Sequence, residues 1–386
     1  MTTTVNNEHK NIKVPNLRFK EFQGEWKEER LADIADLFKG NGISKEQLTD
    51  TGEPCILYGE LYTKYKSEVI SDIFSKTDID TRKLVKSKAN DVIIPCSGET
   101  AVDIATARCV PYDNILLGGD LNIIRLYDCD GSFMSYQLNG KRKYDIAKVA
   151  QGVSVVHLYG DHLKGVKTYN PCLEEQKKIA KLLSLLDERI TTQNKIIEDL
   201  KKLKCAIAER LFKVTNGEVV ALSEVCNIQK GKQVNGDCLS ETGTYYVMNG
   251  GTEPSGYYEQ CNAPADTISI SEGGNSCGYV QYNRDAFWSG GHCYTLTDIQ
   301  SNVCNLYLYH YLKSKESTIM KLRIGTGLPN IQKKDLEKFA VLLPPVVKQV
   351  RISTFLTAIE RKTTNEEILL SHFQEEKQYL LRQMFI

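Results

Sequence analysis

The sequence of 386 residues lacks long apolar runs, paired cysteines and an excess of charge of either sign. No apolar stretch approaches the length that crosses a bilayer, and residues 1–10 contain no apolar core of the kind found in secretory leaders. The 12 cysteines occur singly, with no C-x-x-C pair and no histidine at zinc-ligand spacing. We therefore expect a cytoplasmic protein with reduced thiols and no metal site.

Charge and composition place the chain among ordinary globular proteins. Lys and Arg total 49, Asp and Glu total 49, and 41% of the residues are hydrophobic. The length predicts two or three domains, each with its own core. A net charge of zero is unusual for a free-standing nucleic-acid binder, so such binding would need local basic loops or partner subunits.

Motifs of enzymes are also missing. Residues 38–42 fit the F-x-G-x-G loop that holds a methyl donor, but their counterpart, residues 229–233, lacks the second glycine. There is no Asn/Asp-Pro-Pro-aromatic motif for an extruded adenine and no G-x-x-x-x-G-K-[S/T] loop for ATP. Glu175 and Lys177 lie in a predicted helix, and the 6 histidines are isolated. We expect no catalytic residue in this chain.

The second half of the sequence repeats the first. At an offset of 173, residues 133–213 lie over residues 306–386 without a gap, and Gln176 meets Gln349. The front parts correspond more loosely, at an offset of 191, where Lys39-Gly40 lies over Lys230-Gly231. The middles differ in length and residue type. The order is therefore a variable globular part, a helix, a second globular part and a second helix.

Two long helices are predicted from a heptad pattern. In residues 173–212 and again in 346–386, apolar residues recur at alternating spacings of four and three, as in a coiled coil. Asn170-Pro171 and Pro344-Pro345 precede the helices, and each helix would be about 60 Å long. The expected seam positions are Ile179, Leu183, Leu186, Ile190, Ile197, Leu200, Ile207 and Leu211, then Ile352, Leu356, Ile359, Thr363, Leu370, Phe373, Leu380 and Met384.

Polar residues interrupt both seams and suggest how the helices align. The interruptions are Gln193 and Lys204 in the first helix and Glu366 and Lys377 in the second. If the helices pair antiparallel, Gln193 faces Lys377 and Lys204 faces Glu366, and such buried polar pairs would set the register. The alternative is that these positions are exposed to solvent or meet partner subunits.

The globular parts combine short strands with polar, glycine-rich loops. Strands are expected at residues 92–94, 122–126, 267–270, 279–282 and 294–296. A short amphipathic helix, residues 135–147 and 306–322, should follow in each part before the long helix. The class is α+β.

The loops carry side chains that suit base edges or phosphates. Arg and Lys can bind guanine, Asn and Gln adenine, and Glu can accept from cytosine, while glycines let the backbone approach phosphate. The alternative for each loop is an ordinary turn, but equivalent loops occur in both copies. The DNA-binding candidates are Tyr58, Glu60, Tyr62, Lys64, Ser97, Glu99, Thr100, Arg142, Lys143, Gln151 and Ser154, and in the second copy Lys232, Asn249, Thr252, Ser271, Glu272, Asn275, Ser276, Arg284, His292, Arg323, Thr326 and Asn330.

These features resemble the specificity subunits of bacterial type I restriction–modification enzymes, the HsdS family. The resemblance rests on short motifs spread over the whole chain after about residue 14. They are residues 15–19, 24–26, 31–34, 58–62, 155–158 and 173–179, with 327–331 and 344–345 in the second copy. One departure is the start of the second helix, where Val346-Val347-Lys348-Gln349 replaces the family's Leu-Glu-Glu-Gln.

The resemblance implies a non-catalytic subunit that reads a bipartite double-stranded DNA target, one domain per half-site, across a gap set by the helices. It also implies two adenine methyltransferase subunits and two restriction (motor-nuclease) subunits as partners, which would carry S-adenosylmethionine, ATP and Mg²⁺. The expected fold is two target-recognition domains, each a β-rich α/β globule, separated by two long antiparallel coiled-coil helices with a pseudo-twofold internal repeat. The expected parts are a disordered segment 1–14, recognition domain 15–170, spacer helix 171–216, recognition domain 217–343 and spacer helix 344–386.

One alternative outside this class stays open. A coiled-coil adaptor whose globular domains bind protein or carbohydrate would also suit the loops rich in tyrosine and glycine. Salt-dependent binding to DNA would separate the two interpretations.

Overall fold

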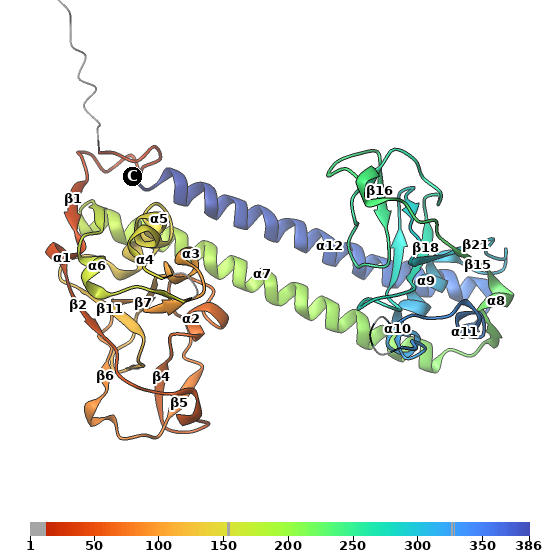
Figure 1. The fold of residues 1–386 in the computed structure, drawn as a ribbon, viewed down its shortest axis with the longest axis horizontal. Helices are drawn as coiled ribbons and strands as arrows, with labels where there is room; N and C mark the ends of the chain where they lie inside the picture. Colours follow the sequence, from red (N-terminus) through yellow and green to blue (C-terminus); the bar gives the residue numbers. More distant parts are fainter. Residues whose placement is uncertain (1–12, 153–154, 326, 328) are drawn as a thin grey trace, which may run out of the picture. The chain divides into compact units, whose positions relative to one another are not determined.

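The computed structural model describes residues 13–152, 155–325, 327 and 329–386. The chain divides into two compact units, which we call unit 1 (Met1–Asn194 with Leu369–Ile386) and unit 2 (Lys195–Ile368). Each unit holds one globular part and one segment of each of two long helices, α7 (Leu173–Val214) and α12 (Val346–Gln383) (Figure 1).

The core of unit 1 is an antiparallel sheet of four strands. Its order is β2 (Ala35–Lys39), β11 (Leu121–Leu126), β7 (Asp91–Pro95) and β9 (Arg108–Val110). The inner strands β11 and β7 are almost wholly buried, and this explains the apolar residues at their centres, Ile123-Ile124 and Val92-Ile93-Ile94. Val92 and Ile124 face one apolar cluster and Ile93 and Ile123 face another, so both faces of the sheet are covered.

Unit 2 contains a sheet with the same strand order. It consists of β15 (Asn227–Lys230), β21 (Cys293–Thr297), β18 (Thr267–Ser271) and β19 (Val280–Asn283), again all antiparallel. The strands expected near residues 92–94, 122–126, 267–270, 279–282 and 294–296 are all present. The internal repeat is therefore a repeat of fold, as the sequence predicted.

Smaller sheets complete each globular part. Both units contain a short antiparallel pair at the base of the globular part and a parallel pair in the variable middle. In unit 1 these sheets are β1 (Lys27–Arg30) with β13 (Lys167–Asn170), β8 (Ser97–Gly98) with β12 (Val156–His157), and the five-stranded set β3 (Leu48–Thr49), β5 (Ser75–Thr77), β4 (Glu53–Ile56), β10 (Leu116–Leu117) and β6 (Val85–Lys86). In unit 2 they are β14 (Glu218–Ala221) with β22 (Ala340–Leu343), and β17 (Tyr257–Tyr258), β16 (Tyr245–Met248) and β20 (Trp288–Ser289).

The amphipathic helix expected in each globular part is broken in two. Residues 135–147 fall in α4 (Gly131–Asn139) and α5 (Lys143–Val149), and residues 306–322 fall in α9 (Asn305–Ser314) and α10 (Glu316–Met320). The breaks lie at Gly140 and Lys315, whose backbone N–H groups bond back to the preceding turn. The expectation of a single helix was wrong because hydrophobic periodicity does not register a change of direction within one to three residues. The remaining short helices are α1 (Leu31–Ile34), α2 (Glu60–Thr63), α3 (Ala101–Ile104), α6 (Gly160–Lys164), α8 (Leu222–Val225) and α11 (Lys333–Glu337).

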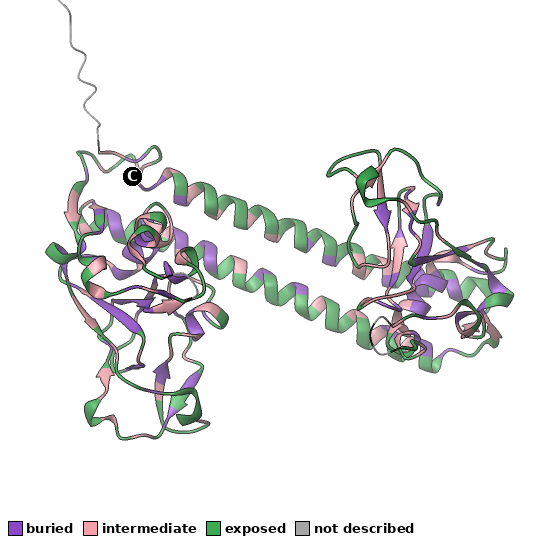
Figure 2. Ribbon diagram, in the orientation of Figure 1, coloured by how far each residue is buried: buried purple, intermediate pink, exposed green. Residues whose placement is uncertain are grey.

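The long helices follow the predicted seam. Every predicted seam position is buried or half-buried, while the other faces of α7 and α12 are largely exposed (Figure 2). In unit 1, Ile179 and Leu183 of α7 pack with Leu381 of α12, and in unit 2, Ala208 packs with Leu356. The two helices therefore pair antiparallel in each unit. Within the part of the chain that the structure describes, no helix is both long and apolar enough to cross a membrane.

One glutamine fixes the start of each long helix in the same way. Gln176 accepts a hydrogen bond from the backbone N–H of Asp130 (2.9 Å) and donates to the carbonyl of Pro171 (2.9 Å). Gln349 accepts from the N–H of Cys304 (2.8 Å) and donates to the carbonyl of Pro344 (2.8 Å). Both side chains are buried, so their polar groups need these partners.

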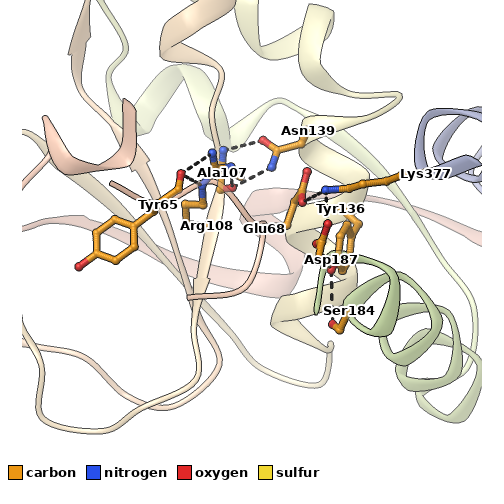
Figure 3. A network of polar contacts seen from close by, with 9 residues as sticks. All are labelled: Tyr65, Glu68, Ala107, Arg108, Tyr136, Asn139, Ser184, Asp187 and Lys377. Carbon is orange, nitrogen blue, oxygen red and sulfur yellow. Dashed lines mark hydrogen bonds and ion pairs between the residues drawn. The ribbon is translucent and has the colours of Figure 1, made fainter. Parts of the chain in front are cut away.

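A buried polar cluster joins the globular part of unit 1 to both long helices. Lys377 of α12 reaches Asp187 of α7 (Nζ–Oδ1 2.6 Å) and Glu68 in a loop (Nζ–Oε2 2.5 Å), as Figure 3 shows. Tyr136 of α4 donates to Asp187 (2.7 Å), with Ser184 beside it. Four elements therefore meet around a single ammonium group.

Unit 2 contains the corresponding cluster, and it corrects the predicted register. Lys204 of α7 pairs with Glu360 of α12 (2.6 Å), and Tyr309 of α9 donates to the same carboxylate (2.9 Å). The expected pairing of Lys204 with Glu366 and of Lys377 with Gln193 is therefore wrong. Acidic residues next to the seam attract each lysine, and the predicted pairing considered only residues within the seam. Gln193 and Glu366 are themselves buried in the seam, and Glu366 also pairs with Lys362.

The end of the chain closes the core of unit 1. Phe385 lies in edge-on contact with Trp26 (ring centroids 6.4 Å apart) and close to Phe133 (5.2 Å). Leu17 donates its backbone N–H to the carbonyl of Gln383 (2.9 Å). The segment before β1 is thus held by the last residue of α12 and by Phe385 beyond it.

We expect Phe385→Ala to lower the free energy of unfolding of unit 1 by about 3–5 kcal/mol, because Phe385 is 2% exposed and fills an aromatic cluster. Tyr379→Ala, at a position that is 52% exposed on α12, should change it by less than about 0.5 kcal/mol. Denaturant titration of both variants measures the difference. Equal losses would show that the closure by Phe385 contributes nothing to stability.

Unit 2 should lose stability in mild acid through His310. His310 is 2% exposed, its Nε2 lies 2.8 Å from Thr357 Oγ1, and burial, followed by nearby Lys204, lowers its pKa to about 4. As the pH falls from about 6.5 towards about 4, the unfolded chain binds a proton that the folded unit does not. We expect a loss of the order of 3 kcal/mol across this window. Thermal unfolding from pH 7 to 4 tests this: His310→Gln should flatten the pH slope, and an unchanged slope would contradict the assignment.

Candidate nucleic-acid interface

A groove of about 710 Å³ in unit 1 gathers several of the predicted reading residues. It lies between α2, β8 and α3 and is lined by Tyr58, Tyr62, Ser97 and Glu99, together with Asp103 and Arg108 among others. Tyr62 donates its hydroxyl to the carbonyl of Ser97 (2.9 Å), and burial raises the pKa of this phenol, so it stays protonated. Tyr58 and Glu99 are exposed at the groove. The groove thus offers a carboxylate acceptor beside aromatic surfaces.

Glycine and threonine give the groove its shape. A Cβ on Gly98 would lie 2.9 Å from the hydroxyl of Tyr62 and 3.2 Å from Cβ of Ile104, so a larger residue here would require these neighbours to shift. Thr100 caps α3, because its Oγ1 accepts from the N–H of Asp103 (3.1 Å). Thr100 therefore has a local structural role, although it is exposed.

A second row of side chains lies beside the groove on β12. His157 pairs with Ser97 across the two-stranded sheet and exchanges backbone hydrogen bonds with Gln151. The Nδ1 of His157 lies 3.4 Å from Ser97 Oγ. Tyr159 stacks with the imidazole of His157, and Lys39 lies over the ring of Tyr159 at 5.2 Å. This arrangement brings a cation, aromatic rings and an imidazole to one face.

Unit 2 presents a related face. Asn330 forms backbone bridges with Gly273 and with Ile324, in the way that His157 bridges β8 and Gln151. Glu272 pairs with Lys230 (2.6 Å), and His292 lies 3.9 Å from the same carboxylate. Tyr294 donates to Glu272 (3.1 Å), and the backbone N–H of His292 donates to Asn249 Oδ1 (3.2 Å). Asn249, Glu272 and His292 therefore lie together, and Asn330 bridges Gly273, the residue after Glu272.

The repeat explains why the two faces correspond. His157 and Asn330 are related by the offset of 173, and Lys39 and Lys230 by the offset of 191. Lys39, His157 and Lys230 were not among the predicted binding candidates. Their matched positions in the repeat were visible in the sequence and would have identified them.

Two predicted reading residues are buried. Glu60 is 6% exposed, accepts from the backbone N–H of Leu57 (2.9 Å) and pairs with Lys64 (2.7 Å). Ser271 is 4% exposed and donates to the carbonyl of Gly250. Both carry out local structural tasks, so the expectation that they meet DNA directly is corrected. Lys64 is in turn engaged with Glu60 rather than standing free.

Arg142 is also engaged elsewhere. It donates to the carbonyl of Ile386 (2.9 Å), pairs with Asp145 (3.2 Å) and lies over the ring of Tyr169 at 5.3 Å. The guanidinium therefore holds the end of the chain. The expectation that Arg142 reads DNA is corrected, because its contact with Ile386 joins residues 244 apart that no local pattern connects. Lys143 begins α5 next to it and is half-buried.

The other candidates are mostly exposed or lie outside the described residues. Exposed candidates are Gln151, Lys232, Thr252, Asn275, Arg284 and Arg323, and Ser276 is half-buried. Ser154 and Thr326 lie outside the described residues. In the described part of the chain no group of His, Cys, Asp and Glu side chains could hold a metal ion. Burial raises the pKa of Cys96, next to β8, to about 11, so its thiol is protonated at neutral pH.

The fold defines a class of protein: two copies of one sheet-based domain, each carrying a face of exposed polar, aromatic and basic side chains and each attached to the same pair of helices. A sequence profile of the type I restriction modification DNA specificity domain matches residues 23–202 and again residues 215–371. The chain therefore belongs to this family.

Relatives named as type I specificity subunits agree with this. One from Mycoplasma pneumoniae is 34% identical over 131 residues, which cover 34% of this chain and only 34% of that relative. One from Mycoplasma genitalium is 23% identical over 69% of this chain and 73% of the relative. The specificity subunit of the type I restriction enzyme MjaVIII of Methanocaldococcus jannaschii is 29% identical over 55% of this chain and 53% of its own length.

Solved structures show the same fold. The S subunit of a type I restriction–modification system from M. genitalium is similar with a TM-score of 0.69 at 20% identity, over 97% of this chain and 99% of that chain. A chain from a structural study of assembly and conformational transition in the type I system is similar with a TM-score of 0.56 at 17% identity, over 93% and 97%. At these identities the likeness concerns the fold alone.

We expect Glu99→Ala and Arg142→Ala to separate recognition from structure. Glu99 is exposed in the groove, so its loss should change base preference in one half of a DNA target by about tenfold. Arg142→Ala should lower the melting temperature and leave base preference unchanged, since its guanidinium holds Ile386. Selection from randomised DNA, with melting curves of both variants, measures the two effects. A change of preference in Arg142→Ala with normal stability would reverse these assignments.

Proposed function

We propose that the chain is the non-catalytic specificity subunit of a type I restriction–modification enzyme and that it reads a bipartite DNA target. Recognition domain 1 (residues 15–170) would read one half-site and recognition domain 2 (residues 217–343) the other. The observation that carries this proposal is the duplicated face: Lys39 with His157 in unit 1 and Lys230 with Asn330 in unit 2 occupy matching positions in the repeat.

The chemistry of the two faces suits different bases. In unit 1, Glu99 offers an acceptor to the amino group of cytosine or adenine, with Tyr58 and Tyr62 beside it. In unit 2, Asn249 and Asn330 can bind adenine edges, and Lys230 and Glu272 offer a donor and an acceptor once their mutual ion pair opens. Two faces with the same backbone and different side chains would give an asymmetric target, with about 1–3 kcal/mol for each good base contact.

The helices would carry the partner subunits. Leu203 of α7 and Phe355 and Ile368 of α12 are about half exposed, and apolar residues so exposed on long helices favour contact with other chains. Residues 171–216 and 344–386 would therefore form the spacer and dock two methyltransferase and two restriction subunits. Those partners would hold S-adenosylmethionine, ATP and Mg²⁺, and the complex would act on DNA in the cytoplasm.

Mapping of methylated adenines tests the proposal. The chain is co-expressed with its methyltransferase partner in a host that lacks DNA methylation, and modified adenines are located across the genome. We expect a motif of two short specific parts separated by an unspecified gap of constant length. The matched control is the methyltransferase partner without this chain, which should leave the genome unmodified.

Other outcomes lead to different conclusions. A short continuous motif would keep the reading of DNA and refute one half-site per domain. Stable co-purification without methylation and without salt-dependent DNA binding would favour the adaptor that binds protein or carbohydrate.

A further inference from the structure

The buried clusters of the two units are equivalent residue by residue. Tyr136, Asp187 and Lys377 in unit 1 correspond to Tyr309, Glu360 and Lys204 in unit 2, since the offset of 173 relates Tyr136 to Tyr309, Asp187 to Glu360 and Lys204 to Lys377. The lysine and the carboxylate exchange helices between the units: in unit 1 the lysine is on α12, and in unit 2 it is on α7. We call each set a triad.

The geometry of the two triads is closely matched. The ammonium–carboxylate distance is 2.6 Å in both, and each lysine also lies over the ring of its tyrosine, at 5.7 Å in unit 1 and 6.0 Å in unit 2. The tyrosine hydroxyl donates to the carboxylate at 2.7 Å and 2.9 Å. The lysine side chains are only 12% and 20% exposed. An ion pair shielded from water in this way is sensitive to the positions of its two groups, because a displaced partner leaves a buried charge without compensation.

Each triad joins three elements that the apolar seam alone does not align. The tyrosine belongs to α4 or α9, which pack on the sheets that carry the candidate reading faces. The carboxylate and the lysine come one from each long helix. An apolar seam tolerates small rotations and translations, whereas a directed ion pair with a hydrogen bond has one good arrangement. The triad therefore sets how the globular part is oriented on the helix pair.

Unit 1 differs by a second carboxylate. Glu68, 7% exposed, also contacts Lys377, so two carboxylates share one ammonium group, as Figure 3 shows. Burial, followed by repulsion from Glu68, raises the pKa of Asp187, whereas the pKa of Glu360 in unit 2 is lowered because Lys204 and Tyr309 outweigh burial. Unit 1 is thus held by an additional loop and depends more strongly on its lysine.

We propose that the two Tyr–carboxylate–Lys triads are positioning elements that fix the orientation of each recognition domain on the helix pair, and that they thereby restrict the enzyme to one gap length between half-sites. This inference rests on the proposed function. Lys377 and Lys204 touch no DNA in this proposal; they act through the domains that they hold.

The experiment compares the gap in methylated targets for the full chain, co-expressed with its methyltransferase partner, in variants Lys377→Met and Lys204→Met. We expect the bases of both half-sites to stay the same, while methylation of sites with a gap one base pair longer or shorter rises by about tenfold relative to sites with the normal gap. Lys377→Arg and Lys204→Arg keep the charge and should restore the single gap. Lys202→Met, at an exposed lysine of α7 that pairs with Glu198, is the matched control and should behave as wild type.

Tyr136→Phe and Tyr309→Phe cover the case in which the lysine variants do not fold. They remove only the hydroxyl that donates to the carboxylate, and they should relax the gap in the same direction and to a smaller extent. A single unchanged gap in the folded lysine and tyrosine variants would overturn the positioning role and leave the proposed function intact. A wild-type chain that yields no bipartite motif would overturn the proposed function and the positioning role with it. Altered bases at a half-site would instead make the triad part of recognition.

Discussion

The apolar seams of α7 and α12 impose the constraint on which the rest of the structure depends. A helix of this length cannot leave such a stripe in water, so each seam must be covered. In unit 1 the start of α7 meets the end of α12 and the helix α4, and in unit 2 the end of α7 meets the start of α12 and the helix α9. Antiparallel pairing therefore gives each globular part the same kind of support, which a duplicated sequence requires.

Polar residues within this apolar contact specify one alignment of the two helices, which apolar packing alone does not. Leucine and isoleucine fill space without specifying one alignment, whereas Lys204 and Lys377 each need a carboxylate at hydrogen-bonding distance. The reading faces then depend on the same supports, because α4 and α9 join the sheets to the helices. Variation of the loops can change side chains at the face while the supporting contacts stay the same. The middles of the two copies, which differ in length and residue type, are consistent with variable loops on a constant support.

Much of the fold was predictable, and the site was predictable in part. Strand β7 was found because residues 92–94 form a short apolar run, and strand β18 because residues 267–270 alternate between polar and apolar. The glycine-rich loops indicated the region of the faces, and Gly98 indeed lies against the side chains of Tyr62 and Ile104. Glu60 and Arg142 were assigned to DNA because their residue types suit it. Only the folded chain shows that the Glu60 carboxylate already accepts from the backbone N–H of Leu57 and that the Arg142 guanidinium already donates to the carbonyl of Ile386.

By itself the sequence determined the repeat, the heptad seams and the α+β class, because hydrophobic spacing and duplication are local properties of the chain. Tertiary structure decided the register of the helices and the partners of the buried charges. Asp187 lies 119 residues from Glu68 and 190 from Lys377, and no local pattern states that these three side chains meet. Burial makes the difference: away from water each charge must find a partner, and the folded backbone decides which partners are within reach.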